Sequence, residues 1–404
     1  MQPMLSQPVI VYRGKRAARW IERILAGDCM RVDLTITELD VGGAERCATE
    51  LACHLAKRGC QVRVIALGPP PPPSRQGLAL QLASHSIPFH FLGGRSSWQI
   101  AKVLFRWRHL VASDRPDVAQ GFIFHANILG SLIYPRFRVP WVGGVRVADP
   151  RRGRQRMEAW ASRRMQRVVC VSQAVAQACR SYPSFAKERI EVIPNGIALR
   201  SEIDKTRQID LRTAHRIPPE APLLLFVGRW EPQKGFDILL HRLPEILRQL
   251  PKHHAVLLGD GSGRSDWKSL QERLDRAIVS RIHAIGFVDR PRDWMAISQL
   301  LILPARYEGM PNAVMEAMAE GMAVAVTRVE GIGELLSQEG QEQTVASSDW
   351  EGWQQMVVRL ASDPERCRSL GARNRHLMES HFQLPQQLDR YLALYRQLVT
   401  PHSR

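Results

Sequence analysis

The sequence has no long apolar run, so we expect no membrane-spanning helix. The longest apolar stretches, such as LLLFV at 223–227, are far shorter than the roughly 20 residues that cross a bilayer. Residues 1–29 are basic and contain no continuous apolar segment, so we expect no signal peptide there.

Cysteine is also sparse. The chain has seven cysteines, an odd number, and none stands in a CxxC pair or at a spacing with histidine that suits a metal. This pattern predicts reduced thiols in a cytoplasmic protein, and it argues against both a disulfide framework and a structural zinc site.

Three phosphate and metal motifs are missing as well. There is no GxxxxGK[ST] segment, so a P-loop is excluded, and LLGDGSGRSDW at 257–267 does not match GxGxxG. That stretch is better explained as a glycine-rich turn after a buried strand. No Asp-x-Asp sequence is present. We expect no metal ion and no bound cofactor.

What is present suggests two α/β domains. At 404 residues with 45% hydrophobic content, the chain can bury two cores. Short β-branched runs alternate with amphipathic stretches, a pattern typical of parallel sheets covered on both faces. We expect strands at 32–37, 61–67, 89–92, 118–121, 141–147 and 168–171, and then at 223–227, 255–259, 282–285, 300–303 and 323–326.

The polar stretch at 198–219 is where we expect the domain boundary. The expected organisation is a basic extension at 1–29, a Rossmann-like domain at 30–198, a second Rossmann-like domain at 199–383, and a terminal helix within 384–404 that packs back on the first domain. Ligands of such doubly wound sheets bind outside the carboxyl ends of the strands, here in a cleft between the domains. The five prolines at 69–73 are interpreted as a stiff surface spacer.

The stretch PARYEGMPNAVMEAMAEGM at 304–322 holds two glutamates eight positions apart. Pro311 favours a helix start near Asn312, which places Glu308 in the preceding loop and Glu316 in the second helical turn. Amides at a helix start attract an anion or a hydroxyl-rich ligand. A carboxylate in the helix can accept both hydroxyls of a ribose, and one in the loop can face a sugar ring. Two solvated glutamates are the alternative.

A second constellation, FVGRWEPQKGFDILL, follows the strand that ends at residue 227. Gly228 and Arg229 come directly after the strand, and Lys234 precedes the next helix. Arginine can clamp phosphate oxygens in a bidentate manner, and lysine supplies a point charge, as a diphosphate leaving group requires. The alternative is a pair of exposed surface cations.

Two weaker signals lie in the first half. Paired glycines at 42–43 precede a helix and allow close approach of a ligand to the backbone at Gly43, although a tight turn without ligand is the usual explanation. His125 follows an expected strand, which aims it at the cleft, although a lone histidine is more often structural.

Taken together, these motifs resemble the retaining family 4 (group 1) glycosyltransferases, which have the GT-B fold. GGAE at 42–45, IPNGI at 193–197, GRWEPQKG at 228–235, GDGSGR at 259–264 and the two spaced glutamates occur in the order and at the distances usual in that family.

The resemblance implies that the domain at 30–198 binds the acceptor and the domain at 199–383 binds the donor, and it implies roles for individual residues. Gly228, Arg229 and Lys234 would hold the donor diphosphate, and Glu316 would bind the ribose hydroxyls. Glu308 and the backbone of Met310, Pro311 and Asn312 would contact the transferred sugar. Backbone at Ile285–Phe287, including Ile285 and Phe287 themselves, would meet the base, His125 would touch the sugar, and Gly43 would approach the phosphates or acceptor. Catalysis would rest on Glu308, His125, Arg229 and Lys234.

The implied function is metal-independent, retaining transfer of a sugar from a nucleotide sugar to a lipid-linked or glycan acceptor in cell-envelope polysaccharide synthesis. A nucleotide-sugar epimerase of the same architecture is one alternative. A nucleic-acid-binding protein is another, but aromatic–basic interleaving and known binding motifs are missing, so we expect no nucleic-acid partner.

The charge distribution suggests a further partner. Residues 1–200 hold 30 Lys and Arg against 13 Asp and Glu, whereas residues 201–404 hold 26 of each. The run RRGRQRMEAWASRRMQR at 151–167 would mix Met157, Trp160 and Met165 with seven arginines on one helix. That mixture suits the anionic inner face of a plasma membrane, although a solvated basic helix is the alternative.

Overall fold

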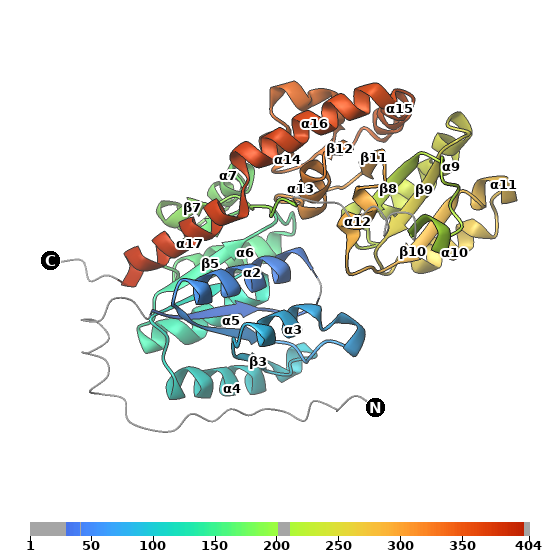
Figure 1. The fold of residues 1–404 in the computed structure, drawn as a ribbon. Helices are drawn as coiled ribbons and strands as arrows, with labels where there is room; N and C mark the ends of the chain where they lie inside the picture. The colour runs from blue at the N-terminus through green and yellow to red at the C-terminus, as the bar shows by residue number, and fades with distance from the viewer. Residues whose placement is uncertain (1–29, 41, 201–210, 400–404) are drawn as a thin grey trace.

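The computed structural model describes residues 30–40, 42–200 and 211–399. The basic extension predicted at 1–29, much of the predicted boundary segment, and the last five residues lie outside this range. The described chain forms two parallel sheets, each flanked by helices (Figure 1).

The first sheet has seven parallel strands in the order β3-β2-β1-β4-β5-β6-β7. They are β1 (Arg31–Ile36), β2 (Gln61–Ala66), β3 (Phe89–Phe91), β4 (Val118–Gly121), β5 (Trp141–Val145), β6 (Arg167–Cys170) and β7 (Ile190–Val192). The central strands β1, β2, β4 and β5 are mostly buried, as a sheet covered on both faces requires, whereas β3 and β7 are only partly buried.

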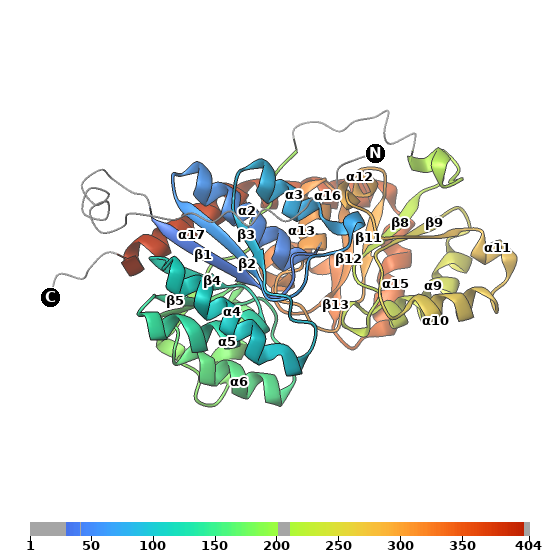
Figure 2. The ribbon, with the colours of Figure 1, turned by 90° about the horizontal axis from the view of Figure 1, so that it is seen from below.

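Helices cover both faces of this sheet, as Figure 2 shows. On one face α2 packs on β1 and β2 and against α3, and on the other α5 packs on β4 and β5 between α4 and α6. The helices are α2 (Gly43–Lys57), α3 (Gly77–Ser84), α4 (Ile100–Ser113), α5 (Phe124–Ile133), α6 (Arg152–Ser162) and α7 (Gln173–Ser181), with short 3-10 turns η1 (Pro73–Arg75), η2 (Ser97–Gln99), η3 (Tyr134–Phe137) and η4 (Lys187–Arg189).

The second sheet has six parallel strands in the order β10-β9-β8-β11-β12-β13. They are β8 (Leu223–Val227), β9 (His254–Leu258), β10 (Ile282–Gly286), β11 (Leu300–Leu303), β12 (Ala323–Arg328) and β13 (Thr344–Ala346). In each sheet the strand order reverses beside the first strand, between β1 and β4 and between β8 and β11. These are the two switch points where ligands of doubly wound sheets bind.

The helices of the second half also form two packed groups. Helix α9 packs against α10, α11 and α15, whereas α13 packs against α12 and α16. Their bounds are α9 (Phe236–Gln249), α10 (Arg264–Gln271), α11 (Arg276–Val279), α12 (Pro291–Met295), α13 (Asn312–Ala319), α14 (Ile332–Leu336), α15 (Trp350–Ala361) and α16 (Pro364–His381), with turns η5 (Pro232–Lys234) and η6 (Gln338–Gln343).

The chain crosses between the two halves at two adjacent places. The amide of Ile197 donates to Phe382 at 2.7 Å, and the amide of Leu384 donates to Ile197 at 3.1 Å. After the second crossing, α17 (Leu384–Val399) lies on the first sheet's helices (Figure 1), where it contacts α2 and β4. Leu388, Tyr391 and Tyr395 are buried in that core.

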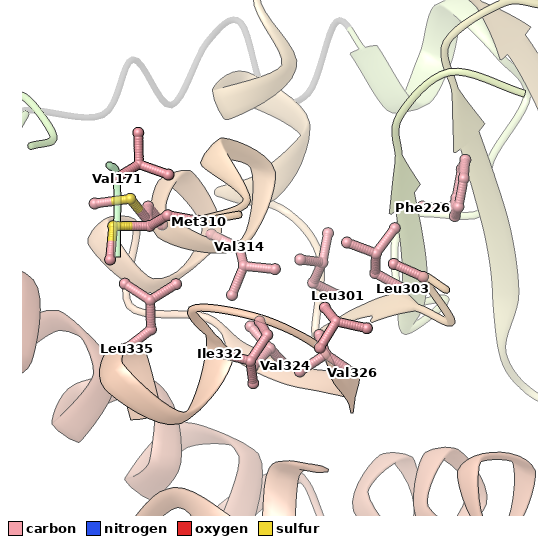
Figure 3. Packing of buried hydrophobic residues seen from close by; sticks show 14 of the residues in the cluster. Val171, Phe226, Leu301, Leu303, Met310, Val314, Val324, Val326, Ile332 and Leu335 are labelled. Atoms are coloured by element: carbon pink, nitrogen blue, oxygen red, sulfur yellow. The ribbon is translucent and has the colours of Figure 1, made fainter. Parts of the chain in front are cut away.

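The cores of the two halves also touch. Figure 3 shows Met310, in the loop before α13, beside Val171, which directly follows β6. Buried apolar side chains therefore continue from one half into the other at the carboxyl ends of both sheets. Among the described residues, no helix combines the length and apolar character needed to cross a membrane.

Two strands and one helix differ from the sequence predictions. Strands β7 and β13 were not predicted; each has three residues, none of which is fully buried. The basic run at 151–167 does not form one helix, since α6 ends at Ser162 and Arg167 already begins β6.

Candidate active site

The loop between β8 and α9 carries the two predicted phosphate-binding cations. Gly228 and Arg229 follow β8, and Lys234 ends η5. Gly235 then adopts a φ of +67°, and a Cβ at this position would lie 1.7 Å from the carbonyl oxygen of Pro304. Glycine is required here, because only a residue without a side chain lets the loop lie directly against the segment after β11.

This close approach brings Lys234 to Glu308. The ammonium Nζ of Lys234 donates to Oε1 of Glu308, and the side chains are only 17% and 7% exposed. A cation and a carboxylate from separate motifs therefore form one partly buried ion pair at the carboxyl ends of the neighbouring strands β8 and β11. Gly228 lies beside it, with a virtual Cβ 3.3 Å from the Lys234 side chain.

Arg229 does not join this ion pair. Its guanidinium is largely exposed and contacts Glu231 at 3.2 Å and Gln233 at 2.8 Å. It also lies near Glu45 in the first turn of α2. Burial raises the pKa of Glu45 to about 7, and the positive charges of Arg146 and Arg229 act in the opposite direction.

Helix α13 begins where the sequence predicted. Pro311 is its N-cap residue in extended conformation and Asn312 is its first helical residue, so Glu308 lies in the loop and Glu316 in the second turn. Glu308 therefore precedes the helix, and Glu316 lies within it. Both are buried.

The loop before α13 is fixed against the first half. The side-chain amide of Asn195 donates to the carbonyl oxygen of Met310 at 3.1 Å and to Oδ1 of Asn312 at 2.9 Å. The side-chain amide of Asn312 donates to the carbonyl oxygen of Gly43 at 3.1 Å. A Cβ at Gly309 would lie 1.9 Å from the carbonyl oxygen of Arg146. The predicted sugar-binding loop and the paired glycines are thus in direct contact.

Glu316 also meets the first half. Its Oε1 accepts a hydrogen bond of 2.6 Å from Arg46, in the first turn of α2. Burial raises the pKa of Glu316, and the nearby positive charges of Arg46, Arg292 and Arg200 act against this rise. A small pocket of about 50 Å³ opens beside this contact, and its lining includes Arg46, Glu50, Ile197, Arg292, Asn312 and Glu316.

The predicted base contacts lie at the end of β10. Ile285 is in the strand, Gly286 has a φ of +91°, and Phe287 follows. The guanidinium of Arg75, which ends η1 after the proline run, lies 5.0 Å from the centre of the Phe287 ring. The proline-rich segment, interpreted from sequence as a spacer, therefore presents a cation to the second half.

His125 is the one predicted catalytic residue that the structure does not link to the donor loops. It is exposed in the first turn of α5, and its ring packs edge-on against Phe124 at 5.2 Å. Partial desolvation and the charge of Arg154 lower the pKa of His125, so its neutral form is favoured.

Several residues that connect the halves were missed in the sequence. They are Arg46, Arg75, Asn195 and Glu334, whose carboxylate accepts from the amides of Gln173 and Ala174 at 3.0 Å each. Arg46 adjoins the GGAE motif and Asn195 stands inside IPNGI, so these motifs contained a signal. No group of three or more potential metal ligands occurs in the part of the chain that the structure describes.

Comparisons with known proteins agree with this architecture. The family Glycosyltransferase Family 4 matches residues 41–201, and the family Glycosyl transferases group 1 matches residues 221–363. One similar relative is the lipopolysaccharide core biosynthesis glycosyltransferase LpsE of Rhizobium meliloti, 26% identical over 87% of this chain and 95% of its own length.

A second relative is the UDP-Gal:alpha-D-GlcNAc-diphosphoundecaprenol alpha-1,3-galactosyltransferase of Escherichia coli, 23% identical over 60% of this chain and 63% of its own length. Among solved structures, Anabaena HepE in complex with UDP-glucose superimposes with a TM-score of 0.78 at 20% identity, over 90% of this chain and all of that one. WaaG, a glycosyltransferase involved in lipopolysaccharide biosynthesis, gives a TM-score of 0.71 at 17% identity, over 91% and 99%.

The two matched families follow each other along the chain and correspond to its two sheets, whose arrangement is that of the GT-B glycosyltransferases. Cations, paired carboxylates and a helix start converge where these sheets meet. The chain belongs to the family 4 (group 1) glycosyltransferases.

Proposed function

We propose that this glycosyltransferase takes its sugar from a nucleoside diphosphate sugar and transfers it with retention of the anomeric configuration and without a metal ion. The observation that carries the proposal is the Lys234–Glu308 ion pair before the start of α13. A cation, a carboxylate and a helix start lie together there, as a diphosphate joined to a sugar requires.

In the proposed mechanism the diphosphate lies between Arg229, Lys234 and the start of α13. Arg229 is exposed and can turn toward the phosphates, while Lys234 already points toward the sugar side. As the sugar–phosphate bond breaks, these cations stabilise the negative charge that develops on the leaving oxygen. Glu308 faces the sugar and stabilises the positive charge that develops on its ring.

The proton transfer needs no separate base. The leaving phosphate oxygen lies on the same face of the sugar as the incoming hydroxyl, so it can accept the proton of that hydroxyl. This geometry gives retention. Since Arg229 and Lys234 neutralise the leaving group, a divalent cation has no required task.

A donor screen tests the first part of the proposal. A bound donor raises the melting temperature by mass action, so thermal shift with a panel of UDP-, GDP-, ADP- and dTDP-sugars should select one or a few. NMR of the product should show the anomeric configuration of the donor, and turnover should continue in excess EDTA. An inverted product or loss of turnover in EDTA would contradict the mechanism.

For the acceptor, we propose a lipid-linked or growing glycan of the cell envelope. Two relatives are named for lipopolysaccharide core biosynthesis and for transfer to a diphosphoundecaprenol-linked sugar. Such acceptors lie at a membrane, and the excess positive charge of the first half of the chain suits an anionic membrane surface. Helix α4 has no acidic residue, and the one acidic residue of α6, Glu158, is buried.

The exposed side chains of these helices support contact with an anionic lipid surface. Met157 and Trp160 on α6 are 47% and 38% exposed, and Trp98 in η2 and Phe105 on α4 are 80% and 74% exposed. The prediction that Met165 shares this surface was wrong, because Met165 is 3% exposed, after the end of α6.

Binding to lipid vesicles tests the proposed contact with an anionic membrane. Arg151 and Arg154 already pair with Asp149, so the informative variant is Arg152→Gln with Arg156→Gln. Each arginine contributes about 1 kcal/mol near an anionic surface, so co-sedimentation with phosphatidylserine vesicles should weaken roughly 30-fold. Arg273→Gln with Arg276→Gln on the second domain is the matched control. Equal recovery with neutral vesicles would contradict the proposal.

A further inference from the structure

Glu316 has an unusual environment for a residue expected to bind ribose. Its side chain is 8% exposed, and its one described hydrogen bond, 2.6 Å long, comes from Arg46 in the other domain. The two residues are 270 positions apart in the sequence. A carboxylate of the donor domain is thus held by a cation of the acceptor domain.

Other cations near Glu316 have closer partners. Arg292 bonds to Glu320 at 2.5 Å and donates to the carbonyl oxygen of Ala198 at 2.6 Å. Arg200 pairs with Asp293 at 2.9 Å and lies 3.7 Å from Glu320. Both therefore support Glu316 only from a distance, and Arg46 provides the direct contact.

The negative charges around Glu316 make this contact important. Glu320 follows it by one helical turn, and Glu50 faces it from α2, one turn beyond Arg46. Burial and these like charges favour the protonated form of Glu316. An ionised carboxylate is an acceptor at both oxygens and can accept hydrogen bonds from two ribose hydroxyls, whereas the protonated form presents a donor at one oxygen.

On the basis of the proposed nucleotide-sugar donor, we infer that Arg46 is a positioning residue for the donor: it keeps Glu316 ionised and aims it at the ribose. The nucleoside site is then complete only when the two domains are in contact. The adjoining pocket has a lining from both domains, as this inference requires.

Calorimetry of nucleotide binding tests the inference, with UDP, GDP, ADP and dTDP as probes. If the wild-type protein binds none of them, the proposed donor is wrong and the inference falls with it. If it binds one, Arg46→Ala should weaken binding about tenfold, as loss of one charge-assisted contact predicts. Arg46→Lys should recover part of the affinity.

Two controls separate positioning from a general structural effect. Arg58→Ala removes the same charge from the other end of α2, where Arg58 pairs with Asp389 at 2.8 Å, and should leave affinity unchanged. Because Arg46 is inferred to act through Glu316, Arg46→Ala should have little further effect in a Glu316→Gln background.

The pH dependence gives an independent measurement. Arg46 lowers the pKa of Glu316, so its removal should raise that pKa, and the loss of affinity on acidification should begin at higher pH in Arg46→Ala. Titrations between about pH 5 and pH 8 cover the range in which a raised carboxyl pKa acts. Unchanged or tighter nucleotide binding by Arg46→Ala, with an unchanged pH profile, would overturn the inference.

Discussion

Removal of Lys234 should affect stability and donor binding separately, because the structure gives this lysine a partner even without ligand. Its partner Glu308 is 7% exposed at the side chain. Breaking a fully buried ion pair by removing one partner costs about 3–5 kcal/mol, since the other charge remains buried. Lys234 is 17% exposed, so water reaches the site, and we expect about 2 kcal/mol for Lys234→Ala.

The double variant Lys234→Ala with Glu308→Gln isolates that cost. A neutral glutamine has no unpaired charge to bury, so most of the lost stability should return. At about 2–4 °C per kcal/mol, Lys234→Ala should lower the first thermal transition by about 4–8 °C, and the double variant should recover more than half of this. Donor affinity should behave differently.

Lost contact with the diphosphate costs about 1.5–3 kcal/mol, and the second substitution cannot restore it. The double variant should therefore regain more than half of the lost stability while binding the donor at least as weakly as Lys234→Ala, since Glu308 is also proposed to contact the sugar. Differential scanning calorimetry and donor titration measure the two quantities on the same samples. Unchanged donor affinity and turnover in Lys234→Ala would refute the assignment, and equal instability of both variants would refute the energetic importance of the ion pair.

Three other substitutions test separate parts of the structure. Gly309→Ala should abolish turnover without changing the far-ultraviolet circular dichroism, because its Cβ would lie 1.9 Å from the carbonyl oxygen of Arg146 and force the domains apart; retained turnover would contradict this. The pKa of Glu158 is raised to about 7 by burial, so its contribution to stability is complete below about pH 4.5 and lost as pH rises through 7. Glu158→Gln should therefore stabilise the protein at pH 8 by up to about 3 kcal/mol in urea titrations, with no gain near pH 4. Arg75→Ala should raise the KM for the donor more than it lowers kcat if its contact with Phe287 closes the base site, whereas a change in kcat alone would contradict that role.

The strands that could be predicted from sequence are those whose apolar runs are buried on both faces. Residues 223–227 and 300–303 have the predicted bounds because every neighbour in the sheet and both helix layers favour the same apolar side chains. The start of α13 was also predictable, since Pro311 restricts the backbone locally. In both cases the information lies within a few residues of the feature.

The contacts between domains could not be predicted in this way. Nothing near Arg46 in the sequence specifies Glu316, and the proline run gives no sign that Arg75 will lie over Phe287. The position of Met165 could not be predicted from the local sequence either. Helical periodicity placed it on an exposed face, but the chain leaves the helix at Ser162, and Met165 fills the space above Gly143.

The positions of the two crossings constrain how these contacts can open. Ile197 bonds to Phe382 and Leu384, so the crossing segments are joined to each other, and beyond them α17 is anchored by the hydrogen bond from Tyr395 to Gln120. Any rotation of the domains would therefore turn about the joined segments. It would separate Arg46 from Glu316 and withdraw Asn312 from Gly43 in the same movement. If the donor binds as proposed, loss of the charge that supports Glu316 would coincide with displacement of the loop before α13, so one rotation would weaken the contacts to both the ribose and the sugar.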